Sequence, residues 1–123
     1  MQTRGQQYAR KIHEQVSKVV NEGERKQYGS MAHKLPVLVR TAGLAQALAF
    51  VEARGSEPAK QLLEDLAQVV EADNKKELLD RSRTYDLVQY MHLTQKVMTA
   101  LIWYKRFAQS VLGVDAGDDK EGE

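Results

Sequence analysis

Apolar residues recur at every third or fourth position along most of the chain. Two runs show this spacing most clearly: Tyr8, Ile12, Val16 and Val19, and then Leu62, Leu63, Leu66, Val69 and Val70. A period of three to four residues is typical of helices that bury one face. No stretch shows the sustained two-residue alternation of a half-buried strand. The pattern therefore predicts an all-α protein.

The segment from about residue 36 to residue 54 is different, because apolar or small side chains would lie on every side of it. Leu35 precedes a proline, which biases it away from helical angles, and Pro36 suits the first turn of a new helix. Gly55 marks the expected end of this helix. A helix that is apolar all round is buried on all sides. We therefore expect a central, nearly all-apolar helix over 36–54.

Other helical segments are expected to surround this central helix. They fall at about 8–23, 56–70, 77–80 and 85–112, and a short segment at about 25–34 is interrupted by Gly29. Ser56 can cap the helix over 56–70, with Pro58 in its first turn. Residues 1–112 are thus predicted to form a single compact bundle of about five to six helices. The stretch 113–123 is acidic and rich in glycine, so we expect it to be disordered and dispensable for folding.

Length and composition narrow the class of protein. With 123 residues, the chain has room for one hydrophobic core but not for two. It has no cysteine, which excludes disulfides and thiolate metal sites. No apolar run approaches the roughly 20 residues that span a bilayer, and the first seven residues lack the apolar core of a secretory signal. We expect a soluble, cytoplasmic protein.

No motif for catalysis or cofactor binding stands out. The glycines match neither GxGxxG nor GxxxxGKS/T, and no serine lies in a GxSxG turn. The three histidines lack the i, i+4 pairing of a helical zinc site. The acidic residues between 71 and 86 lack the glycine turn and ligand spacing of a calcium loop. We expect no catalytic residue, no metal and no cofactor, so an enzyme is only a formal alternative.

The net charge of +1 conceals an asymmetry along the chain. The first 54 residues carry nine basic and four acidic side chains, whereas the rest carry nine basic and thirteen acidic ones. Arg4, Lys11, Lys18 and Arg25 recur at seven-residue intervals, which on one continuous helix forms a stripe with steps of about 10 Å. Such a stripe can follow a phosphate backbone without reading bases. The alternative is an ordinary solvated face, which Glu14 in its midst favours.

The last helix has more apolar surface than one core-facing stripe needs. Val88, Ile102 and Trp103 lie opposite that stripe, next to Arg106. Tryptophan and arginine are enriched in the hot spots of protein interfaces. Two interpretations stay open: a surface for a partner, or a tryptophan covered by another helix of the same bundle.

Two blocks of sequence resemble a known family. YGSMAHKLPVLVRTAGLAQALAFVEA at 28–53 and WYKRFAQ at 103–109 are similar to blocks of the small subunit of the type III-B CRISPR Cmr effector complex. The matching positions are dense around Lys34-Leu35-Pro36, Arg40, Gly43-Leu44, Gln46 and Phe50, and again at Trp103 and Lys105-Arg106. The chain departs from the family at Ala42, where asparagine is common, and at Tyr104, where leucine is common. The resemblance covers most of residues 1–112.

The resemblance implies a helical bundle without catalytic activity, whose copies form a filament braced against the backbone subunits of the complex. Backbone and large subunits, further copies of the chain, and the guide and target RNA would be its partners, with RNA meeting a sequence-independent basic face. The candidate RNA-facing residues are Arg4, Lys11, Lys18, Lys34 and Arg40. The candidate partner-interface residues are Trp103, Lys105 and Arg106. A helical protein–protein adaptor that never contacts nucleic acid is the alternative.

Overall fold

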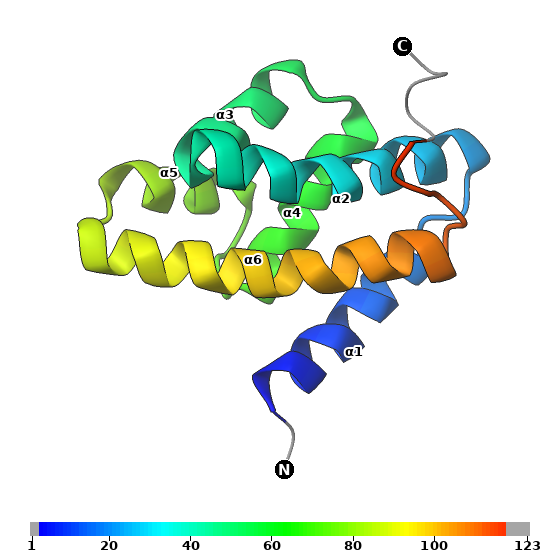
Figure 1. Ribbon diagram of the computed structural model, residues 1–123, viewed down its shortest axis with the longest axis horizontal. Helices are drawn as coiled ribbons and strands as arrows, with labels where there is room; N and C mark the ends of the chain where they lie inside the picture. Colours follow the sequence, from blue (N-terminus) through cyan, green and yellow to red (C-terminus); the bar gives the residue numbers. More distant parts are fainter. Residues whose placement is uncertain (1–2, 118–123) are drawn as a thin grey trace.

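The computed structural model describes residues 3–117, which form six helices and no strand (Figure 1). The helices are α1 (Arg4–Ser17), α2 (Glu22–Ala42), α3 (Leu44–Arg54), α4 (Glu57–Val69), α5 (Lys75–Thr84) and α6 (Leu87–Ser110). The long helices α2 and α6 lie side by side, α4 packs on α2, and α1 crosses α6 (Figure 1). This arrangement confirms the predicted all-α bundle.

Five of the six helices begin at a polar side chain that accepts a hydrogen bond from the backbone N–H three residues later. These residues are Thr3, Asn21, Ser56, Asn74 and Asp86. Such caps satisfy backbone donors that the first turn of a helix leaves without a partner. The predicted cap at Ser56 is confirmed, with Pro58 in the first turn of α4.

The predicted helix over 36–54 is wrong in its start and in its continuity, whereas its predicted end before Gly55 is confirmed, because α3 ends at Arg54. Pro36 lies inside α2, where it and Leu35 are both buried. The break comes at Gly43, whose φ of 88° and ψ of 158° belong to a region that only glycine populates readily. The hydroxyl of Tyr90 accepts a hydrogen bond of 3.1 Å from the N–H of Ala45 in the first turn of α3. Pro36 costs α2 one backbone hydrogen bond, and the burial of Leu35 and Pro36 in the bundle outweighs that loss.

This stretch is also not buried on all sides. Leu35, Leu44 and Leu48 are completely buried, but Val37 and Phe50 are each about half exposed. The segment therefore contributes one face of α2 and one face of α3 to the core. The expectation of a helix enclosed on every side is wrong, because the bend at Gly43 turns α3 away from the axis of α2.

The other boundaries differ from the predictions by several residues. The first helix ends at Ser17 rather than near Gly23, the short turn predicted at 77–80 is the ten-residue α5, and the last helix covers 87–110. Gly23 lies in the first turn of α2, where an exposed glycine does not stop a helix.

A polar network in the core joins four of the helices. The carboxylate of Asp65 on α4 accepts a hydrogen bond of 2.6 Å from the hydroxyl of Tyr28 on α2, and another of 2.9 Å from Gln61. Gln15 on α1 donates to the backbone carbonyl of Asp65 and accepts a bond of 2.5 Å from the hydroxyl of Tyr104 on α6. Burial raises the pKa of Asp65 above its ordinary value of 3.8, although the bonds from Tyr28 and Gln61 act in the opposite direction.

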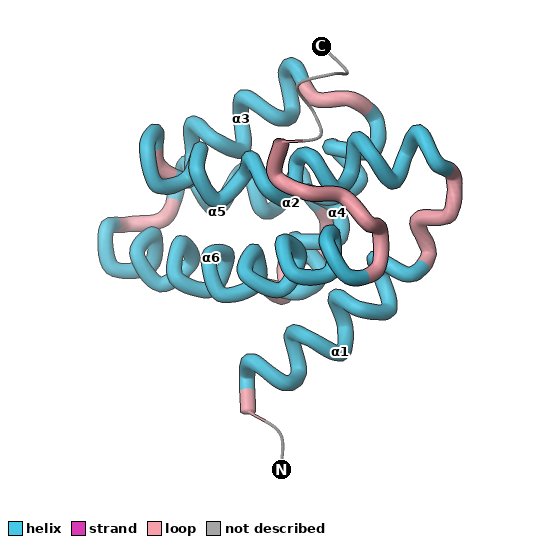
Figure 2. Tube along the Cα trace, turned by 45° about the vertical axis from the view of Figure 1, so that its right-hand side comes forward, coloured by secondary structure: helices cyan, strands magenta, loops and turns pink. Residues whose placement is uncertain are grey.

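The chain beyond α6 folds back onto α2, as Figure 2 shows for the terminal loop. Val114 is buried, its N–H donates to the carbonyl of Ala108, and its own carbonyl accepts a bond of 2.8 Å from Nε2 of His33. The side chain packs directly on Gly29, where a Cβ would lie only 2.7 Å from that of Val114. The expectation that nothing beyond Gly113 docks is therefore wrong at Val114. The expected disorder of 118–123 lies outside the described residues.

Two truncations separate the docked valine from the rest of the tail. We expect a chain ending at Gly117 to melt within a couple of degrees of the full chain. A chain ending at Gly113 loses the burial of Val114 and its two hydrogen bonds, so its free energy of unfolding should fall by about 1.5 kcal/mol. Thermal denaturation followed by circular dichroism measures both. Equal melting temperatures for the two truncations would mean that Val114 contributes nothing.

Candidate nucleic-acid and partner interface

The predicted basic stripe is confined to α1. Arg4 and Lys11 lie on this helix and Lys18 is its C-terminal cap, and all three are exposed. Arg25 belongs to α2 instead and is partly buried, because its guanidinium donates a hydrogen bond of 2.6 Å to the carbonyl of Val111. The continuous helix that would have placed four cations in line is therefore not present.

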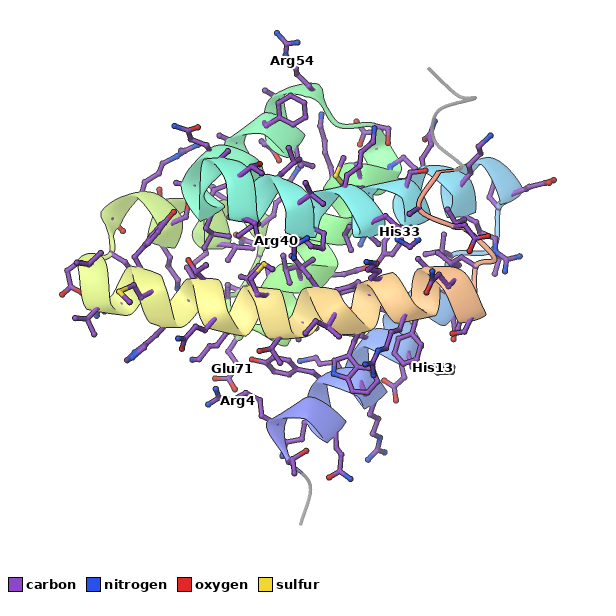
Figure 3. All side chains as sticks on the ribbon, viewed as in Figure 1. Arg4, His13, His33, Arg40, Arg54 and Glu71 are labelled. Atoms are coloured by element: carbon purple, nitrogen blue, oxygen red, sulfur yellow. The ribbon has the colours of Figure 1, made fainter. Side chains whose placement is uncertain are left out.

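Two cations of the stripe have interactions within the molecule. The ammonium group of Lys11 lies 3.1 Å from the backbone carbonyl of Gln68 and donates a hydrogen bond to it. Arg4 lies beside Glu71 on the lower side of the molecule (Figure 3). Burial raises the pKa of Tyr8 above its ordinary value. The positive charge of Arg4 acts to lower this pKa, and the negative charge of Glu71 acts to raise it. The acidic neighbour weakens the field that Arg4 presents to an anion.

A basic groove of about 360 Å³ runs between α2 and α6. This α2/α6 groove is lined by His33, Pro36, Arg40, Met98, Leu101, Ile102, Lys105, Arg106 and Gln109. None of these side chains is acidic. The groove brings Arg40, a candidate for RNA, together with Lys105 and Arg106, which were candidates for a protein partner. Two sets that the sequence kept apart thus share one surface.

Trp103 lies beside this groove, toward α1. It is partly buried against the core and stacks on Phe107, with ring centroids 5.8 Å apart at 26°. The rings of Phe107 and His13 on α1 in turn meet edge to face, with their centroids 5.2 Å apart. The guanidinium carbon of Arg106 lies 5.0 Å from the centre of the Trp103 ring. Trp103 is therefore only partly buried, and its ring packs against the guanidinium group of Arg106 on the wall of the α2/α6 groove.

A second basic groove, of about 500 Å³, lies on another side of α2. This α2/α3/α4 groove is lined by Gly23, Lys26, Gln27, Ser30, Met31, Lys34, Phe50, Arg54, Gly55, Ser56 and Ala59, again without an acidic side chain. Lys34 therefore lies apart from Arg40. Lys26 and Arg54 were not singled out in the sequence, although Arg54 immediately precedes the Gly55–Ser56 boundary that the sequence does mark.

The cations predicted to face RNA thus divide among three surfaces. Arg4, Lys11 and Lys18 lie on α1, Lys34 lies in the α2/α3/α4 groove and Arg40 lies in the α2/α6 groove. Figure 3 shows Arg40 between α2 and α6, whereas Arg54 projects from the end of α3 at the top of the view. Both grooves combine cations with apolar walls, which suits a phosphate-bearing chain bound without base readout.

Within residues 3–117, the structure brings no three histidine, cysteine, aspartate or glutamate side chains together in a way that could hold a metal ion. Over the same residues, no helix combines the length and apolar character that crossing a membrane requires.

Known proteins resemble this chain over nearly its whole length. The family model described as CRISPR-associated protein (Cas_Cmr5) matches residues 4–111. The CRISPR system Cmr subunit Cmr5 of Thermus thermophilus is 48% identical over 112 residues, which are 91% of this chain and 98% of that protein. The X-ray crystal structure of a CRISPR-associated Cmr5 family protein from the same organism has a TM-score of 0.85 at 49% identity, covering 90% of this chain and 98% of the other. The family match includes all six helices.

Proposed function

Because the chain belongs to the family of CRISPR-associated Cmr5 proteins, as its resemblance predicted, we propose that it is a non-catalytic subunit of a type III-B Cmr effector complex. In this role it braces the backbone subunits, associates with further copies of itself and lines the channel in which guide and target RNA pair. The complex would act in the cytoplasm against foreign nucleic acid. The name of the Thermus relative, a Cmr subunit, supports this assignment.

The observation that carries the RNA-facing role is the α2/α6 groove. It places Arg40, Lys105 and Arg106 around one hollow with no acidic side chain among its lining residues. Arginine guanidinium groups match phosphate geometry in a bidentate manner. Apolar neighbours such as Ile102 lower the local dielectric and strengthen each contact. A protein beside a paired RNA needs this kind of sequence-independent contact, because base pairing supplies the specificity.

Neutralising this groove should weaken RNA retention by the assembled complex. We expect the double variant Arg40→Gln, Lys105→Gln to lower the slope of log affinity against log salt concentration by about 1.4 to 1.8, because each lost phosphate contact removes about 0.7 to 0.9. Filter binding of RNA to the reconstituted complex at several salt concentrations measures the slope.

The matched control is Lys11→Gln, Lys18→Gln on α1, which removes the same charge from a different surface. If only the α1 variant changes the slope, RNA meets the complex along α1 and the groove assignment fails. If neither variant changes it, the adaptor without nucleic-acid contact becomes the better description of this subunit. Thermal melting of both variants verifies that each is folded.

The protein-partner role has its own test at Arg106. This exposed side chain contributes little to the fold, so Arg106→Ala should leave the melting temperature within a couple of degrees of that of the natural chain. It should weaken capture by the backbone subunit if the rim of the groove is an interface. Trp103→Ala is less informative, because it also removes packing on Phe107. Unchanged capture would remove Arg106 from the interface.

A further inference from the structure

The α2/α6 groove has the size and the lining of a pocket for a small ligand. Its volume of about 360 Å³ lies at the lower end of the range of about 300–1,000 Å³ that such pockets span, which is too small to admit an RNA duplex. Pro36, Met98 and the half-exposed Ile102 supply apolar walls. Arg40 and Lys105 are exposed and supply positive charge. The groove thus offers apolar surface for a planar base next to cations for a phosphate.

A stack of planar side chains on α6 ends at this groove. Phe107 stacks on Trp103 with ring centroids 5.8 Å apart, and the guanidinium carbon of Arg106 lies 5.0 Å from the centre of the Trp103 ring. Arg106 is exposed and lines the groove, so the side of its guanidinium that faces away from Trp103 is open to a ligand. Contact with the indole restricts the orientation of this guanidinium. Unpaired RNA bases stack on arginine guanidinium planes as they do on aromatic rings.

We infer that the α2/α6 groove holds one nucleotide of a single-stranded stretch of RNA, its base stacked on Arg106 and its phosphate bound by Arg40 and Lys105. The inference rests on the proposed function, because RNA must reach this groove, and it adds that the bound base is unpaired. A base inside a duplex is covered on both faces by its neighbours, so it cannot lie on Arg106. Stacking tolerates any sequence, since every base has a π-face.

A strand without bases separates stacking from phosphate contact. The probes are a short oligouridylate and an abasic oligoribonucleotide of the same length and charge, each titrated into the full-length chain at low salt. We expect the oligouridylate to bind about fivefold to tenfold more tightly, because one stacked base adds to its affinity. Trp103 is the only tryptophan of the chain, so its fluorescence should change with the oligouridylate and much less with the abasic strand.

Equal affinities for the two strands, or an unchanged Trp103 fluorescence, would overturn the stacking and leave the phosphate contacts of the proposed function in place. A fluorescence change on adding the backbone subunit, with none on adding either strand, would assign the groove to a protein instead.

Pairing the oligouridylate with oligoadenylate gives a second test, because the two kinds of contact predict opposite signs. The duplex carries the phosphates of both strands, so phosphate contact alone predicts binding at least as tight as that of the single strand. Stacking on Arg106 predicts binding about fivefold weaker, because paired bases are not available to the groove. Duplex binding as tight as that of the single strand, or tighter, would contradict the inference.

Arg106→Lys keeps the charge of the groove and removes the planar group. It should reduce the affinity for the oligouridylate to that for the abasic strand, while the slope of log affinity against log salt stays the same. Arg54→Lys in the α2/α3/α4 groove is the matched control and should change neither quantity. A preference for the strand with bases that survives Arg106→Lys would overturn the stacking on this residue. If Arg40→Gln, Lys105→Gln changes the affinity for neither strand, RNA does not bind this groove and the proposed RNA-facing role fails with the inference.

Discussion

Replacing Tyr28 with phenylalanine is expected to lower the free energy of unfolding by about 2–3 kcal/mol at pH 7. The hydroxyl of Tyr28 donates a bond of 2.6 Å to the buried carboxylate of Asp65. Hydrogen bonds to charged groups are worth about 1.5–3 kcal/mol, more than bonds between neutral groups. After the substitution, the carboxylate keeps only its side-chain bond from Gln61. Urea denaturation monitored by circular dichroism measures the loss.

The loss at Tyr28 should depend on pH in a defined direction. Burial raises the folded-state pKa of Asp65 above 3.8, so its protonated form is favoured in the fold. The contribution of this raised pKa to the free energy of unfolding is fully present below pH 3.8, and it is lost as the pH rises through the folded-state pKa. Because the Tyr28 bond lowers this pKa, Tyr28→Phe should raise it further. The effect of the substitution should therefore shrink toward about 1 kcal/mol as the pH falls and the carboxyl is protonated.

Tyr104 provides the matched control for this charge dependence. It is equally buried, and its hydroxyl donates to the neutral amide oxygen of Gln15. Tyr104→Phe should cost about 1 kcal/mol, with little change over the same pH range. A pH dependence of the same size in both variants would contradict the assignment of the charged partner to Tyr28.

Gly29→Ala is expected to have opposite effects in two forms of the chain. In the full chain, the new methyl group would lie 2.7 Å from the Cβ of Val114, so the valine must leave its site. The loss of that packing and its hydrogen bonds, about 1.5 kcal/mol, should exceed the gain of about 1 kcal/mol from replacing a helical glycine, giving a net destabilisation of about 0.5 kcal/mol. In a chain ending at Gly113, the same substitution should stabilise by about 1 kcal/mol.

The two values define a coupling of about 1.5 kcal/mol between Gly29 and the docked segment, the same as the cost of removing that segment. Thermal melting of the four proteins in this cycle measures it. Gly23→Ala, at an exposed position in the first turn of α2, is the control substitution because its Cβ would meet nothing closer than 3.5 Å. If Gly29→Ala stabilises both chains equally, Val114 can move away from the new methyl group without lowering the free energy of unfolding, and the docked segment is loosely held.

The all-α class and the start of α4 could be predicted from the sequence because local signals determine them. At Ser56, a cap followed by Pro58 acts within one turn. The break at Gly43 could not be predicted, because Pro36 gave the stronger local signal and the bundle overrides it. The N–H of Ala45, two residues after this glycine, donates to the hydroxyl of Tyr90, which is distant in the sequence. Contacts over such separations leave no periodic trace.

The candidate site was predicted in its residue types but not in its grouping. Arg40 and Lys105 come from segments 65 residues apart, and only the packing of α2 on α6 places them around one groove. Lys34 and Arg40 are close in sequence yet line different grooves. The valine at 114 was missed because its burial depends on a single glycine of α2, which looks in the sequence like no more than an interruption.

The bend at Gly43 allows one stretch of sequence, residues 40–54, to line two different surfaces of the protein. In one straight helix, Arg40 and Arg54 would lie about 21 Å apart and within about 40° of the same side. With the bend, they line two different grooves. The bend thus gives the subunit two separate cation-lined grooves, and a substitution in one groove leaves the lining of the other unchanged. Because the φ of 88° at Gly43 suits only glycine, another residue at 43 would change the angle between the two grooves while leaving the charge of each groove intact.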